Sequence, residues 1–161
     1  MNTELNFLRK EALQELETNI LPFWMQQCID TEHGGFIGRI RGDGSADPDA
    51  PKGAILNARI LWAFSAAFRV LGKKEYIETA TRAKREIIDR FYDKEYGGVF
   101  WSLDSQGRPL DTKKQIYALG FAIYGLSEYA RATGDKEAKD YALRLFNDIE
   151  KYSFDNAKNG Y

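Results

Sequence analysis

Hydrophobic and polar positions recur along most of the chain at helical spacing. Two segments, 74–91 and 136–151, carry an apolar stripe on one side and charged residues on the other, whereas 54–71 and 114–132 are apolar almost all round. A helix without a polar face must be buried on most sides. We therefore expect outer helices with one wet face to alternate with buried inner helices. The full set of predicted helices is 3–19, 54–71, 74–91, 114–132 and 136–151.

Two sequence markers repeat with nearly the same period. Segment 30–36 returns as 93–99, and a weaker third copy begins at Asp155, so that the leading aspartates are almost evenly spaced. The second marker, at 72–75, returns at 134–137, which is nearly the same interval. Units of this length bury their apolar faces only against neighbouring units. The chain is therefore predicted to be all-α and to form part of an (α/α)6 toroid or barrel, a ring size taken from known toroids.

The connections between these helices are of two kinds. Each outer-to-inner connection is long, contains Gly-Gly, and is predicted to form a short β-hairpin in the rim, at 98–108 and, in its earlier copy, at 35–45. Each inner-to-outer connection is tight, and glycines are expected to cap the preceding helices at Gly72 and Gly134. The long connections at one end of the ring would surround a central cavity, where ligands commonly bind.

Length and composition narrow the class of protein. The 161 residues suit one domain, residues 1–161, with a formal net charge of −1 that makes nucleic acid and anionic membranes poor partners. A single cysteine excludes an intramolecular disulfide and a multi-cysteine zinc site. The start is polar, and the apolar stretches 60–67 and 116–126 are too short or too interrupted to span a bilayer, so we expect a cytoplasmic protein. The chain stops one residue past the third glycine marker, which suggests the N-terminal portion of an incomplete ring.

Arg59 is the informative polar residue, because it lies in the first inner helix among apolar neighbours. A guanidinium keeps its proton and is costly to bury without a partner. One interpretation is a structural ion pair between neighbouring inner helices. The other is a ligand clamp, since five fixed donors suit the oxygens of a sugar or an enediolate.

Other candidate side chains carry weaker signals. Tyr117 and Tyr124 lie two turns apart on the second inner helix, where they could fill the core or stack on carbohydrate. His33 is the only histidine, and its repeat equivalents are not histidine, which argues against a catalytic role. Cys28 is expected to be a small buried residue. The recurring aspartates, Asp30 among them, are expected to fix Asx turns before the glycines.

Several segments together resemble the N-acylglucosamine 2-epimerase family. They are Leu-Pro-Phe-Trp at 21–24, Gly-Gly-Phe at 34–36, Lys-Gly at 52–53, the first inner helix at 56–67, and the residues at 113–117 and 121–127. The Asn-Ala-Arg-Ile-Leu-Trp sequence at 57–62 is more similar to the cellobiose 2-epimerase branch, which includes mannobiose 2-epimerases, than to the N-acylglucosamine branch.

This resemblance implies an (α/α)6 barrel whose central cleft inverts C2 of a reducing-end aldose such as cellobiose, mannobiose or N-acylglucosamine. It assigns Arg59 to substrate binding and to catalysis, by steadying the enediolate, and Tyr117 to substrate binding. No metal and no organic cofactor is expected, and the partner is a small carbohydrate. The family's acid/base histidines would lie beyond Tyr161. One histidine cannot serve both faces of C2, so we expect residues 1–161 alone to be inactive and to self-associate through open inner-helix faces.

Two other function classes stay open at this point. A glycoside hydrolase on the same toroid would need two cleft carboxylates at a defined separation, yet no inner helix contributes an acid before Glu128. A non-catalytic helical-repeat module would bind protein partners along a concave inner face, which calls for charges there; Arg59 is the only charge in the first apolar run.

Overall fold

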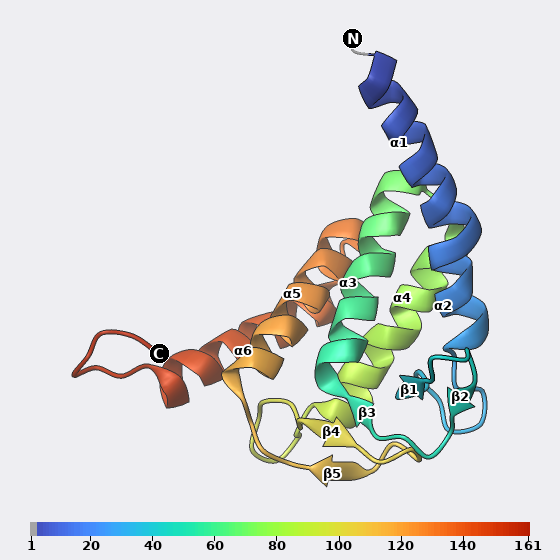
Figure 1. Cartoon of the computed structure of the whole chain (residues 1–161). Coiled ribbons are helices and arrows are strands. Elements are labelled where there is room, and N and C mark those ends of the chain that lie inside the picture. The colour runs from blue at the N-terminus through green and yellow to red at the C-terminus, as the bar shows by residue number, and fades with distance from the viewer. Residues whose placement is uncertain (1–2) are drawn as a thin grey trace.

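The computed structural model describes residues 3–161, and helices dominate them. The predicted alternation of outer and inner helices is confirmed, and Figure 1 shows the inner helices α3 and α5 in front of the outer helices α4 and α6. The helical elements are α1 (Thr3–Glu15), η1 (Leu16–Ile20), α2 (Leu21–Gln27), α3 (Ala54–Leu71), α4 (Lys74–Glu86), η2 (Ile87–Phe91), α5 (Ile116–Thr133) and α6 (Lys136–Ser153).

The first outer helix is longer than the sequence predicts. We expected it to end at residue 19, before the proline at position 22, but α1, η1 and α2 run without a break to Gln27. Proline has no N–H to donate and normally ends a helix interior. Here the chain makes a wider π-helical turn, in which the Leu21 N–H donates to the Leu16 carbonyl, and Pro22 sits at the start of the helical stretch that follows.

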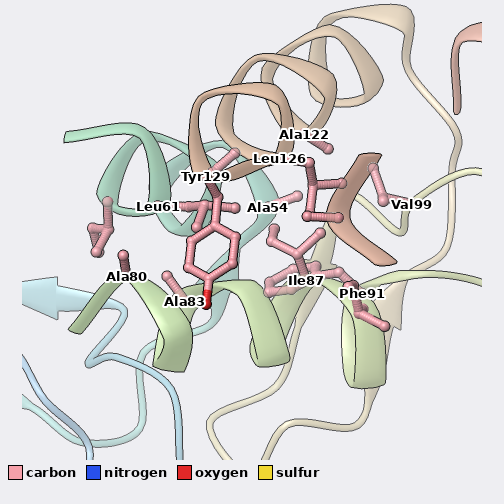
Figure 2. Packing of buried hydrophobic residues seen from close by; sticks show 14 of the residues in the cluster. Ala54, Leu61, Ala80, Ala83, Ile87, Phe91, Val99, Ala122, Leu126 and Tyr129 are labelled. Atoms are coloured by element: carbon pink, nitrogen blue, oxygen red, sulfur yellow. The ribbon is translucent and has the colours of Figure 1, made fainter. Parts of the chain in front are cut away.

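The core lies where the inner helices meet the outer ones. Leu61 of α3, Ile87 of η2 and Leu126 of α5 are each almost fully buried, and Phe91 and Val99 extend the same cluster toward the rim (Figure 2). Burial of apolar surface contributes about 25 cal/mol per Å². This packing is therefore what holds the two repeats together, as the apolar patterns predict.

The two inner helices are in close contact at a pair of small residues. A Cβ atom built on Gly125 of α5 would lie 2.6 Å from the carbonyl oxygen of Ala58 on α3, and Leu61 lies against the same spot. Gly120, earlier on α5, has no atom within 4 Å of the equivalent position. Gly125 is therefore required by packing, whereas Gly120 is not.

Replacing Gly125 with alanine is expected to destabilise the chain by about 1–3 kcal/mol, because the added methyl group forces α3 and α5 apart. Gly120→Ala is the matched control, since it has open space and should gain up to about 1 kcal/mol from the better helix propensity of alanine. Urea unfolding of both variants measures the difference. Equal stabilities would contradict the close contact.

Short antiparallel strands form the rim at one end of the helices. Strand β1 (Arg39–Ile40) pairs with β2 (Ala46–Asp47), and β4 (Ser102–Leu103) pairs with β5 (Pro109–Asp111), which confirms both predicted hairpins. A further strand, β3 (Lys52–Gly53), pairs with β4. The sequence did not predict this pairing, which joins the rim connections of successive repeats in one sheet (Figure 1).

The predicted turns are confirmed. Asp30 Oδ1 accepts the backbone N–H groups of Glu32 and His33, and Asp93 Oδ1 accepts the equivalent pair in the second repeat. The glycines that end α3 and α5 have φ of 73° and 76°, the left-handed conformation in which glycine is favoured. Recurrence of these aspartates therefore reflects a structural role.

The expectation about membranes needs one correction. The apolar stretches of the sequence suggested segments too short to span a bilayer, but α3, with 18 residues, is long and apolar enough by length and composition alone. The core helix of a globular protein meets the same test, and α3 packs between α4 and α5. Location in the cytoplasm stays a prediction.

Candidate active site

A hollow opens between the two inner helices on the side away from α4 and α6. Its volume is about 870 Å³, within the range of small-molecule sites. It brings together the two residues that the sequence singled out, Arg59 and Tyr117. The side chains around it include Arg59 and Trp62 from α3 and Tyr117, Phe121 and Tyr124 from α5.

The Arg59 side chain is exposed at this hollow, and among residues 3–161 it has no hydrogen-bond or ion-pair partner. The ion pair between neighbouring inner helices does exist, but other residues form it: Arg69 Nε lies 2.7 Å from Glu128 Oε1, and Glu128 is buried. Among residues 3–161, Arg59 therefore does not form the structural ion pair that was one of its two interpretations. Its guanidinium is free to receive a ligand.

Both tyrosines of α5 lie at the hollow rather than in the core. Tyr117 is 62% exposed, and its ring meets Phe121 edge-on with centroids 5.0 Å apart. The Tyr124 ring stacks on Trp62, with centroids 4.8 Å apart and an interplanar angle of 12°. Trp62 was missed as a site residue, although it occupies in the first repeat the position that Tyr124 occupies in the second, so the repeat period could have paired them.

His33 and Cys28 lie apart from the hollow. His33 belongs to the rim connection, where its carbonyl oxygen accepts a hydrogen bond from Arg90 Nη1. Cys28 is fully buried, and that burial raises the pKa of its thiol to about 11, so it is not a reactive thiolate. Within residues 3–161, no three histidine, cysteine, aspartate or glutamate side chains converge as a metal site would require.

A buried ion pair fastens the first rim connection to the start of α3. Lys52, only 1% exposed, places its Nζ 2.7 Å from Asp30 Oδ2 and 2.5 Å from the Gly34 carbonyl oxygen. Burial disfavours the charged form of Asp30, but the His33 N–H and the Lys52 ammonium outweigh it and lower the pKa of that carboxyl. The pair thus fixes the connection that leads into the helix bearing Arg59.

The second repeat contains the equivalent ion pair, which is more exposed to solvent. Lys114 Nζ lies 2.6 Å from Asp93 Oδ2, and the Gly98 N–H donates to Asp148 Oδ2 at 2.8 Å. Lys114 is the repeat equivalent of Lys52. The repeat period therefore contained the signal for this pairing, but the lysines were not recognised as structural.

Glu86 lies beside the Gly-Gly pair of the first repeat, in the position that Asp148 has beside the Gly-Gly pair of the second repeat. Its carboxylate lies against Gly35, and the repeat period that relates the two lysines also relates Glu86 to Asp148. Burial raises the pKa of Glu86. The positive charge of Arg90, whose Nε lies 3.6 Å from Glu86 Oε2, acts in the opposite direction but is outweighed. This charged cluster belongs to the rim and does not line the hollow between α3 and α5.

A second, more apolar groove runs between the first outer helix and α3. Its volume is about 710 Å³, and its walls are aliphatic and aromatic except for Arg59. Such a surface suits the packing of an apolar helix better than the binding of a polar ligand. We therefore place the candidate active site in the hollow that contains Tyr117.

Comparison with known proteins decides the family. The family model described as N-acylglucosamine 2-epimerase (GlcNAc 2-epimerase) matches residues 35–161. The chain belongs to the N-acylglucosamine 2-epimerase family. The resemblance drawn from the inner-helix residues is thereby confirmed.

Individual relatives place this epimerase-family chain in one branch. It is 66% identical over 154 residues to a cellobiose 2-epimerase of Bacteroides fragilis, which covers 96% of the chain, and 48% identical over 145 residues to one of Ruminococcus albus, which covers 90%. The solved structure of a cellobiose 2-epimerase from Bacillus thermoamylovorans superposes with a TM-score of 0.94 at 43% identity over 97% of the chain. Both the predicted branch and the predicted barrel architecture are confirmed.

The chain is much shorter than these family members. It spans 39% and 37% of the two curated relatives and 40% of the solved chain.

Proposed function

We propose that the protein containing these residues is a sugar 2-epimerase that inverts C2 of a reducing-end aldose such as cellobiose, mannobiose or N-acylglucosamine. The observation that carries this proposal is the unpartnered Arg59 guanidinium, which shares a hollow with Tyr117 in a chain of the epimerase family. Relatives that are 66% and 48% identical to the chain are cellobiose 2-epimerases. A disaccharide with a free reducing end is accordingly our first choice of substrate.

The reaction needs an anion-stabilising group and two proton carriers. Removal of the C2 proton from the open-chain aldehyde puts negative charge on the carbonyl oxygen and gives an enediolate, which the fixed donors of Arg59 would stabilise. Tyr117, largely exposed in the hollow, would hold the substrate through its hydroxyl. Inversion then requires one base on each face of C2.

Those proton carriers are not found at the hollow within residues 3–161. The one histidine of the sequence, His33, lies in the rim connection, and no acidic side chain of residues 3–161 lines the hollow. We therefore infer that the acid/base histidines come from sequence beyond Tyr161 and that residues 1–161 alone are inactive.

We also infer that residues 1–161 form the N-terminal portion of an (α/α)6 ring. The proposal is supported by the share of the relatives' length that the chain covers and by the open groove beside α3. By itself this portion leaves apolar inner-helix surface uncovered and is expected to self-associate.

Proton exchange at C2 tests the proposed activity. The complete gene product is incubated with cellobiose, mannobiose or N-acetylglucosamine in heavy water, and deuterium at C2 and the C2 epimer are followed by NMR. We expect both products with at least one sugar, and none with residues 1–161 alone. If no sugar exchanges or epimerises, the epimerase proposal is wrong.

The alternative of a glycoside hydrolase is disfavoured by Glu128. That residue is the first acid on an inner helix, but it is buried and paired with Arg69 rather than open to the hollow. A hydrolase needs two carboxylates flanking the scissile bond. A protein-binding repeat would need charges along the inner face. Among the described residues, the charges on α3 and α5 are only Arg59, the Arg69–Glu128 pair and the neighbouring Arg131.

A further inference from the structure

Trp62 and Tyr124 form an aromatic pair at the hollow, and the proposed roles of Arg59 and Tyr117 do not involve this pair. The two rings lie face to face, with centroids 4.8 Å apart, and they connect α3 to α5 at the hollow. Tyr124 keeps 44% of its surface exposed although Trp62 covers one face of its ring. Its exposed surface therefore does not include the ring face that Trp62 covers.

Further contacts hold the Tyr124 ring in place. Phe121 meets it edge-on, at 89° and 6.2 Å between centroids, while Trp62 supports it from one side. The Tyr124 hydroxyl makes no hydrogen bond to any residue within the described range. The ring is thus oriented by aromatic contacts, and Tyr124 lines the same hollow as Arg59.

We propose that Tyr124, backed by Trp62, is a stacking surface for the reducing-end pyranose and that it contacts the ring face that carries the C3 and C5 hydrogens. This inference rests on the proposed epimerase function and names the substrate features that the same hollow selects. An aromatic face binds a patch of C–H groups well, while the neighbouring guanidinium binds hydroxyl oxygens. Tyr124 is then a specificity-determining residue, and Trp62 is a positioning residue.

The chemistry of the substrate and product favours that face. In the usual chair of D-glucose the axial hydrogens of C3 and C5 point to one side of the ring. The axial hydroxyl that distinguishes D-mannose at C2 points to the other side. A surface that touches the C3 and C5 side therefore accepts both C2 epimers equally, as an enzyme acting in both directions requires. D-Allose, whose axial C3 hydroxyl points to this same side, would lose the contact.

Saturation-transfer NMR and kinetics on the complete gene product test the proposal. With cellobiose, D-glucose and D-mannose, we expect the strongest saturation at the C3 and C5 protons of the reducing ring, and at least tenfold weaker binding of D-allose. Tyr124→Leu should raise the dissociation constant and KM for cellobiose about tenfold, with a smaller change in kcat. Tyr124→Phe and Trp62→Phe, which keep an aromatic ring, should stay within about threefold of the wild type. Tyr152→Leu, an exposed tyrosine on α6, is the matched control.

The outcomes separate this proposal from the proposed function. If Tyr124→Leu lowers the melting temperature but leaves cellobiose binding unchanged, or if D-allose binds as well as D-glucose, the pair is only a contact between helices and the stacking role is wrong. If sugars bind through the C3 and C5 face but C2 never exchanges, the stacking role stands and the epimerase proposal fails. Absence of any sugar binding overturns the stacking role as well.

Discussion

Replacing Arg59 with alanine in the complete gene product is expected to lower kcat/KM for C2 epimerisation by about 10²–10³-fold, the usual effect of removing one group that stabilises a developing oxyanion. Its side chain is exposed in the hollow and has no ion-pair partner within residues 3–161, so removal takes away ligand contacts and little else. The melting temperature should accordingly change little. Arg59→Lys keeps the charge but loses the planar fork of donors, and it should recover only part of the rate.

Arg39→Ala is the control for this experiment. Arg39 is an exposed arginine of the rim whose Nη1 lies 3.6 Å from Asp47 Oδ2, outside the hollow. Its loss should leave kcat/KM within twofold of the wild type. Initial rates of epimer formation by NMR give the comparison. Full activity of Arg59→Ala would show that the guanidinium does not act on the substrate.

The largest effect on stability is expected from Lys52→Met, which should lower the free energy of unfolding by about 3–5 kcal/mol. Lys52 and Asp30 are both almost fully buried, so removing the ammonium leaves an uncompensated carboxylate in the interior. Lys113→Met is the matched control, because the Lys113–Asp111 pair has nearly the same length, 2.9 Å, but both partners are exposed. That change should cost less than about 1 kcal/mol.

Urea unfolding followed by circular dichroism measures both lysine variants. Asp30→Asn combined with Lys52→Met removes both charges and should recover part of the lost stability, since no buried charge remains. A loss below about 1 kcal/mol for Lys52→Met alone would mean that the rim connection is held by its backbone turns rather than by the ion pair.

The helical framework was predictable because it depends on where apolar residues recur. The inner helix 54–71 has the predicted bounds, and the capping glycines and Asx turns follow from local chemistry. The first outer helix is longer than predicted, and the π-helical turn that lets it continue past Pro22 has no clear sequence signal. The pairing of β3 with β4 joins segments that α3 and α4 separate along the chain, and local patterns do not specify such a distant contact.

The candidate site was predictable only in part. Arg59 stood out because a lone charge in an apolar helix needs an explanation, but the sequence could not decide between an ion pair and a ligand. That choice depended on which arginine faces Glu128, and the structure assigns this role to Arg69. The contributions of Trp62 and Lys52 were missed, although each has an equivalent in the next repeat.

The close contact at Gly125 has a geometric consequence for the proposed ring. A ring of inner helices encloses a bore whose circumference is the sum of the spacings between neighbours. The Ala58 carbonyl lies directly against Gly125, so the backbones of α3 and α5 are in close contact at this point. A bulkier residue at this contact would push α3 and α5 apart and widen the hollow that Arg59 and Tyr117 share.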